Sequence, residues 1–187
     1  MQFIAAIISA YCPFICPIYA RERVLPEGSG EYVVLLHGIG RTRRPMEKIE
    51  KRLQEADFKV WNERYPSTSK TIKSLTESRI AVAVAFCRRK NATKIHFVTH
   101  FMGGILVRLY RQNNRLPAGS RLVMPSPPNH GSEVVDRFRK LSAFKWLFGP
   151  AGQELRTELQ SMPNQLRPVS ADIGVIAGEK SSDPGFQ

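Results

Sequence analysis

The stretch that most constrains the fold of this chain runs from residue 94 to residue 110, KIHFVTHFMGGILVRLY. Its first half is rich in β-branched and aromatic residues, which favours a strand. Its second half repeats apolar residues at spacings of three and four, which favours a helix. Two adjacent glycines, Gly103 and Gly104, allow the tight corner that must join them. The stretch therefore predicts a strand, a sharp turn and a helix in immediate succession.

The same alternation of strand and helix extends along most of the chain. An apolar run such as YVVLL, at residues 32–36, is typical of a parallel strand buried on both faces. Alternating strands and helices predict an α/β fold with a doubly wound, mostly parallel sheet and three layers. We expect strands at residues 32–37, 59–65, 94–100, 120–124 and 173–178, and helices at about residues 45–56, 67–89, 101–113, 132–148 and, more weakly, 153–166.

Two of these helices carry specific expectations about caps and buried faces. Ser67 or Thr68 could cap the second helix, and Ser132 could cap the fourth. We expect the second helix to bury Ile72, Leu75, Val82 and Phe86. We expect the fourth to carry Val134, Val135, Phe138 and Leu141, and to continue into an apolar cluster of Phe144, Trp146, Leu147 and Phe148.

Length and charge limit the possible classes of protein. The 187 residues, 42% of them apolar, are enough for one domain, which we place at residues 21–187. The net charge of +12 favours a solvated basic surface, or attraction to an anionic membrane or to nucleic acid. Aromatic residues are not interleaved with the basic clusters, and no nucleic-acid-binding motif accompanies them, so nucleic acid is the disfavoured partner.

Residues 1–20 are predominantly apolar and carry no charged side chain. Their length favours a signal peptide with Ala20 before the cleavage point, although Ile18 is large for its position and no Lys or Arg precedes the run. A hydrophobic anchor and a packed N-terminal arm are the alternatives. Pro13 and Pro17 argue against a regular spanning helix. We expect export to the periplasm or medium, or membrane association, and a cytoplasmic location if the run is not a signal.

The three cysteines do not indicate a metal centre. Cys12 and Cys16 lie in the apolar N-terminal run without a nearby pair of histidines, which is a poor zinc site. Cys87 falls in an expected helix and is most simply a core residue. We expect neither a metal nor a cofactor.

Three motifs carry a resemblance to a known family. His37-Gly38-Ile39-Gly40 follows the first expected strand, and Thr99-His-Phe-Met-Gly-Gly104 forms the corner described above. A Pro-Pro-Asn-x-Gly-Ser loop follows the fourth strand within residues 124–136. Across about residues 30–180, this order resembles the α/β-hydrolase superfamily, in its small lipase and esterase branch. Its corner is the nucleophile elbow, and the family's elbow normally reads H-S-x-G-G.

The resemblance implies acyl transfer and assigns roles to residues by their positions. An elbow serine would attack an ester carbonyl, activated by a histidine that an acidic residue orients. Backbone N–H groups of Ile39 or Gly40 and of Met102 would form the oxyanion hole. His37, Gly38, Gly103, Gly104 and His130 would support the loops around it.

Two departures from the family pattern affect the chemistry. Phe101 occupies the nucleophile position and has no nucleophilic atom. The family histidine comes last in the chain, whereas this sequence has histidines only at positions 37, 96, 100 and 130. The last strand and helix of the family pattern do not follow residue 178 in this sequence either, and Asp183 stands where the triad acid could be. His130 is the best remaining general base, and Ser126 and Ser132 lie on its loop.

These observations predict a lipase or esterase-like protein with impaired catalysis. Four interpretations remain open: a degenerate hydrolase product, a pseudoenzyme that binds an acyl or lipid ligand, a hydrolase with another nucleophile, and a basic module for membranes or nucleic acid. Acyl esters or lipids are the expected partners. The sequence does not indicate an oligomeric state.

Overall fold

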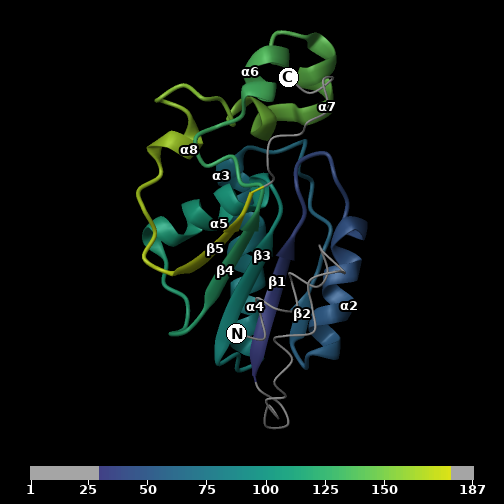
Figure 1. Ribbon diagram of the computed structural model, residues 1–187, viewed down its shortest axis with the longest axis vertical. Helices are drawn as coiled ribbons and strands as arrows, with labels where there is room; N and C mark the ends of the chain where they lie inside the picture. The colour runs from purple at the N-terminus through teal and green to yellow at the C-terminus, as the bar shows by residue number, and fades with distance from the viewer. Residues whose placement is uncertain (1–29, 178–187) are drawn as a thin grey trace.

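A five-stranded parallel sheet forms the centre of the computed structural model, which describes residues 30–177 (Figure 1). The strand order is β2-β1-β3-β4-β5, and all four pairings are parallel. The expected α/β fold with a parallel sheet is therefore confirmed. The strands are β1 Glu31–Leu36, β2 Lys59–Trp61, β3 Lys94–Thr99, β4 Arg121–Pro125 and β5 Asp172–Ile176.

Helices cover both faces of the sheet and make it three layers deep. Val33 and Leu35 of β1 pack against α2, whereas Val34 and Leu36 pack into the larger core formed with α3, η2, α4 and α5. This alternation is the two-residue period of a strand. The helical segments are η1 Arg44–Met46, α2 Glu47–Glu55, α3 Ile72–Leu75, η2 Thr76–Ile80, α4 Ala81–Arg89, α5 Met102–Asn113, α6 Glu133–Phe138, α7 Ser142–Gln153 and α8 Met162–Gln165.

The predictions for residues 1–20, including Cys12 and Cys16, and for Asp183 fall outside the described residues. Within residues 30–177, every helix is too short or too polar to cross a membrane. Cys87 is fully buried, as expected of a core residue, and burial raises the pKa of its thiol to about 11.

The second predicted helix is interrupted by a π-helical segment, η2, and its buried face differs from the prediction. Val82 was expected inside but is 51% exposed, whereas Ile80 and Ala83 are fully buried. A π turn contains one residue more than an α turn, so it rotates the residues that follow it around the axis. The predicted cap was also wrong, because Thr71 accepts the Ser74 N–H and caps the helix three or four residues later than expected.

The chain after β4 departs most from the prediction. Ser132 occupies the N-cap position of α6, but its side chain makes no capping hydrogen bond. Trp146 is 84% exposed and Leu147 52%, so only Phe144 of the expected apolar cluster is buried. The expected helix over residues 153–166 is mostly irregular and contains only the short α8. Helices α6 and α7 instead stand over the carboxyl ends of the strands (Figure 1).

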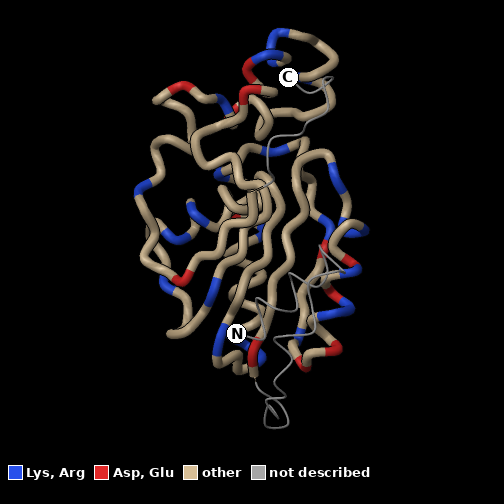
Figure 2. The backbone as a smooth tube through the Cα atoms, viewed as in Figure 1, with Lys and Arg blue, Asp and Glu red and all other residues tan. Residues whose placement is uncertain are grey.

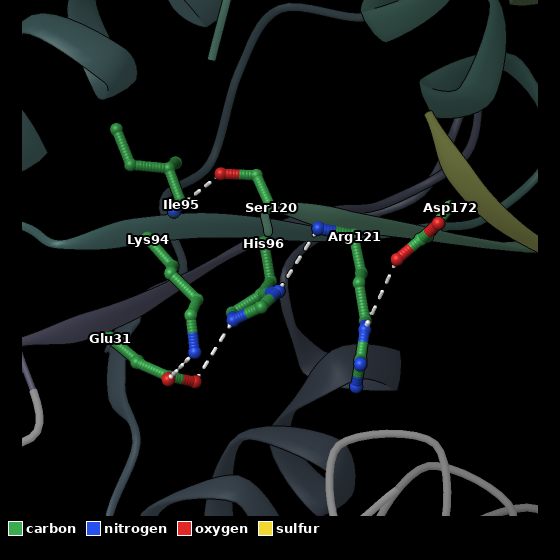
Figure 3. Close-up of polar contacts among 7 residues, drawn as sticks. All are labelled: Glu31, Lys94, Ile95, His96, Ser120, Arg121 and Asp172. Carbon is green, nitrogen blue, oxygen red and sulfur yellow. Dashed lines mark hydrogen bonds and ion pairs between the residues drawn. The ribbon is translucent and has the colours of Figure 1, made fainter. Parts of the chain in front are cut away.

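A polar cluster fixes the amino ends of the strands (Figure 3). The Glu31 carboxylate accepts hydrogen bonds from Lys94 and, at 3.1 Å, from His96 Nε2. His96 Nδ1 accepts the Arg121 N–H at 3.1 Å, so the proton of the neutral ring lies on Nε2. Burial lowers the pKa of His96, against the opposing effect of Glu31. These contacts join β1, β3 and β4 at the end of the sheet opposite the elbow.

Strand β5 is an edge of the described sheet, and its Ile173 and Val175 are 36% and 53% exposed. Exposed apolar edges favour pairing between chains. We expect Ile173→Lys to reduce self-association in light scattering, with a change below ~1 kcal/mol in unfolding free energy. The control, Leu159→Lys, changes a side chain that is 87% exposed away from the edge. Equal effects of both substitutions would contradict edge pairing.

Candidate active site

The elbow lies between β3 and α5, and Phe101 is its central residue. Phe101 has φ 50° and ψ −117°, a region that non-glycine residues rarely occupy. Its N–H donates to the Pro125 carbonyl at 3.1 Å, and its carbonyl accepts the Gly104 N–H at 3.1 Å. Such a conformation costs ~1–3 kcal/mol and persists only where the surroundings enforce it. The corner between β3 and α5 is thus held in a strained conformation around a phenylalanine.

The glycines of the elbow allow the close approach of α5 to the strands. A Cβ on Gly103 would lie 2.9 Å from Leu36 Cβ and 3.1 Å from the Leu36 carbonyl oxygen. A Cβ on Gly38 would lie 2.7 Å from His100 Nδ1 and 3.3 Å from Phe101 Cβ. The turn after β1 and the elbow after β3 therefore touch, and no side chain fits between them.

This contact falls where the chain order reverses in the sheet. Strand β1 has β2 on one side and β3 on the other, and the His100 N–H donates to the Leu36 carbonyl at 2.9 Å. Ligands of open parallel sheets bind outside the carboxyl ends of the strands at such a switch point. The topology thus places the two predicted motifs at the usual position of a binding site.

His37 is a fixed support for the turn after β1. Its Nδ1 donates to the Gly38 carbonyl at 2.9 Å, and its Nε2 accepts the Tyr65 N–H at 3.4 Å. The Tyr65 ring stacks on the imidazole at a centroid distance of 4.0 Å, and its hydroxyl donates to the His37 carbonyl. Burial lowers the pKa of His37, so the ring stays neutral with the proton on Nδ1. Both ring nitrogens are engaged, which leaves none for proton transfer.

The three proposed oxyanion donors differ in their availability. The Gly40 N–H donates to Ser67 Oγ at 3.2 Å and is already engaged. The N–H groups of Ile39 and Met102 make no hydrogen bond to any acceptor within the described residues. Met102 is the first residue of α5, where a helix leaves its N–H groups without internal partners. Ile39 and Met102 therefore keep N–H groups without an acceptor in the described part of the chain, although both residues are buried.

A cavity of about 520 Å³ opens beside Phe101, towards the loop after β4. Ser126 and His130, both exposed, line it together with Phe101. Ser126 has φ 47°, and its N–H donates to the Ile176 carbonyl at 2.8 Å. The remaining lining residues are Pro127, Pro128, Asn129, Gly131, Ser132, Val175 and Ala177.

His100 lies on the other side of the elbow. It lines a separate cavity of about 200 Å³ with His37, Gly38 and Arg41, rather than the cavity of Phe101. Burial, and to a smaller extent the charge of Arg41, lowers the pKa of His100. This position agrees with a structural role.

The structure adds site residues that the sequence analysis missed. Tyr65 and Ser67 hold the turn after β1, although they follow β2 and lie 28 and 27 residues further along the chain. No local motif marks such contacts; the only signal is their place after the neighbouring strand. Among residues 30–177, no group of three or more His, Cys, Asp or Glu side chains could hold a metal ion.

Together, the parallel sheet, the strained elbow and the glycine turn define an α/β-hydrolase-like fold of the lipase and esterase type. The phospholipase PlaB from Legionella pneumophila superposes with a TM-score of 0.63 and 19% identity, over 83% of this chain and 40% of the phospholipase. The mature lipase BlEst2 from Bacillus licheniformis superposes with a TM-score of 0.62 and 15% identity, over 91% of this chain and 72% of the lipase.

A second structure of PlaB, in complex with thio-NAD, gives a TM-score of 0.61 at 20% identity, over 80% of this chain and 38% of the phospholipase. The chain thus spans about two fifths of the phospholipase. No protein-family model and no characterised protein sequence matches it. At these identities, the likeness establishes the fold.

Proposed function

We propose that this protein binds an acyl or lipid ligand at the elbow and does not hydrolyse it. The observation that carries the proposal is Phe101, held in the elbow conformation at the position of the nucleophile. Covalent acyl transfer needs an oxygen, sulfur or nitrogen atom to attack the carbonyl. A benzyl group has none, so the elbow can hold an ester without reacting with it.

The surroundings of Phe101 support binding. The adjacent cavity is wide open to solvent, and its volume of about 520 Å³ lies within the ~300–1,000 Å³ range of small-molecule sites. Phe101, Pro127, Pro128 and Val175 give it apolar walls. Met102 follows Phe101 directly, and its N–H, which has no acceptor within residues 30–177, would donate to a carbonyl or carboxylate oxygen that reaches it. The two superposed proteins, a phospholipase and a lipase by name, are consistent with a lipid ligand.

Exposed apolar residues on α7 suggest how a lipid would be reached. Trp146 and Leu147 are 84% and 52% exposed, and exposed Lys145 lies beside them. Aromatic and aliphatic side chains next to basic ones are typical of surfaces that contact anionic membranes. With a net charge of +12, the protein would be attracted to such a surface.

Purified protein is expected not to hydrolyse p-nitrophenyl butyrate above the buffer rate, while it binds a fluorescent fatty acid. Val175→Asp, which places a carboxylate on the apolar wall of the cavity, is expected to weaken fatty-acid binding at least ~10-fold, since the bound acyl chain would cover the charge and remove it from water. The matched control, Leu159→Asp, adds the same charge outside the cavity and should retain binding.

Two results would contradict the proposal. Saturable hydrolysis that disappears on Ser126→Ala or His130→Ala would show that the protein is a hydrolase with another nucleophile or base. Fatty-acid binding that is absent, or equally weakened by both aspartate substitutions, would remove the acyl cavity as the ligand site.

A further inference from the structure

A third cavity, of about 570 Å³, lies on the β1–β2 side of the elbow and is strongly basic. Arg41, Arg64 and Arg79 line it, together with the hydroxyl-bearing residues Thr42, Ser67 and Thr68. No aspartate or glutamate is among its lining residues. Figure 2 shows Lys and Arg spread over the fold rather than gathered in one stretch, so the convergence of three arginines on one hollow is a feature of the tertiary structure.

Within residues 30–177, no carboxylate neutralises the three arginines. None of them forms an ion pair with a carboxylate within residues 30–177, where Arg43, Arg52, Arg121, Arg139 and Arg156 do. Arg79 Nε is buried and makes no hydrogen bond in the described part of the chain. Buried donors are nearly always paired, so a ligand acceptor that reaches Arg79 would satisfy a donor that the described chain leaves unpaired, as it also leaves Arg111 Nε and Arg156 Nε.

The lowered pKa values of two nearby histidines agree with this excess of positive charge. Burial is the main reason that the pKa values of His37 and His100 are lowered, but Arg64 lowers the first further and Arg41 the second. The positive charge on the cavity wall therefore acts both at the turn after β1 and at the elbow after β3. Arg79 projects from the π-helical segment η2, a type of distortion often found at functional sites.

We propose that this cavity binds the phosphate group of a soluble metabolite or of a lipid headgroup. A guanidinium group donates two parallel hydrogen bonds to phosphate oxygens, and three of them around one hollow match a multiply charged anion. Ser67 Oγ accepts the Gly40 N–H, so its own hydrogen is free to donate to the ligand.

The phosphate site does not depend on the acyl cavity. Its lining residues come from the loops after β1 and β2, from η2 and from Leu147 of α7, whereas the acyl cavity is lined by Phe101, β5 and the loop after β4. The two cavities share no lining residue. Either can therefore fail in experiment without the other.

The test is calorimetric titration of the full chain with inorganic pyrophosphate. The variant Arg64→Gln/Arg79→Gln is expected to bind at least ~100-fold more weakly, or about tenfold for each arginine whose charge-assisted hydrogen bonds are removed. The control Lys48→Gln/Lys51→Gln removes the same two charges from exposed positions of α2 and should stay within about twofold. If the double variant does not fold, Arg64→Gln is measured alone, because Arg64 is exposed and its replacement should not disturb folding. This single substitution should weaken pyrophosphate binding about tenfold.

Vesicles distinguish the two sources of phosphate. Binding of the unmodified protein and of both double variants to phosphatidic acid vesicles is compared with their binding to oleate-containing vesicles of equal charge. If the protein prefers phosphatidic acid, and only Arg64→Gln/Arg79→Gln loses this preference, the ligand is a lipid headgroup. If the protein binds pyrophosphate without preferring phosphatidic acid vesicles, the ligand is a soluble phosphate compound. Absence of any anion binding, or equal loss in both double variants, would overturn the proposal.

Discussion

Gly103→Ala is expected to lower the melting temperature by about 2–12 °C. The new Cβ would lie within 2.9 Å of Leu36 Cβ and 3.2 Å of Thr99 Cβ, so α5 or the strands must move apart. Overpacking of this kind costs ~1–3 kcal/mol, and each kcal/mol corresponds to ~2–4 °C in a domain of this size. Helix propensity alone would predict the opposite sign, because alanine is favoured over glycine inside a helix.

Gly174→Ala is the matched control for this measurement. Gly174 lies in β5, and its new Cβ would meet only Val123 Cγ2 at 3.8 Å, an ordinary contact. Thermal unfolding followed by circular dichroism should show little change. If the two alanine variants have the same melting temperature, the contact between α5 and β1 is not tight, and the elbow has no steric need for glycine.

Much of the fold was predictable because buried parallel strands leave a strong local signal. The apolar runs of β1, β3, β4 and β5 were each placed within two residues of their observed ends, while β2 proved four residues shorter than predicted. The glycine corner after β3 was predictable for the same reason, since few sequences permit it. What the sequence could not show is that Phe101 adopts the elbow conformation instead of relaxing it.

The errors have a common physical origin in contacts between distant parts of the chain. Periodicity assumes a regular helix, so it cannot anticipate the π-helical turn that moves Val82 outward. The start of α3 is fixed by Thr71 and also by Glu154, whose carboxylate accepts the Ile72 N–H from 82 residues away. Trp146 looked like a core residue by type, but α7 stands at the edge of the core and leaves it exposed.

The candidate site likewise contains residues that a local motif predicts and residues that only the fold brings together. Residues that carry a local motif, such as His37, Phe101 and Met102, were named from the sequence. The basic cavity was not, because Arg41, Arg64 and Arg79 belong to three separate segments that only the sheet order brings together. A charge count gave the excess of positive charge but not its position.

Phe101→Ser is expected to create a weak esterase, with turnover of p-nitrophenyl esters ~10³–10⁴-fold above the rate in water. That is the catalysis that remains in serine proteases when triad members are removed, and it comes from the oxyanion hole and binding. The new hydroxyl would precede the N–H of Met102, which has no acceptor within residues 30–177, in a backbone conformation suited to an elbow serine. A serine hydroxyl without a base is a poor nucleophile near neutral pH, so the turnover rate should not rise above this level.

The decisive comparison is with Phe101→Ser/His130→Ala. His37 has both ring nitrogens engaged, His96 lies at the amino ends of the strands, and His100 lines another cavity. Of the four histidines, His130 is the one that lines the cavity of Phe101, so it is the one to test as a hidden base. A general base contributes ~10²–10⁴-fold, so an unchanged rate in the double variant means that His130 does not serve. A rate that falls by that factor means that His130 acts as the base for the new serine. In that case Phe101 alone separates the protein from a hydrolase.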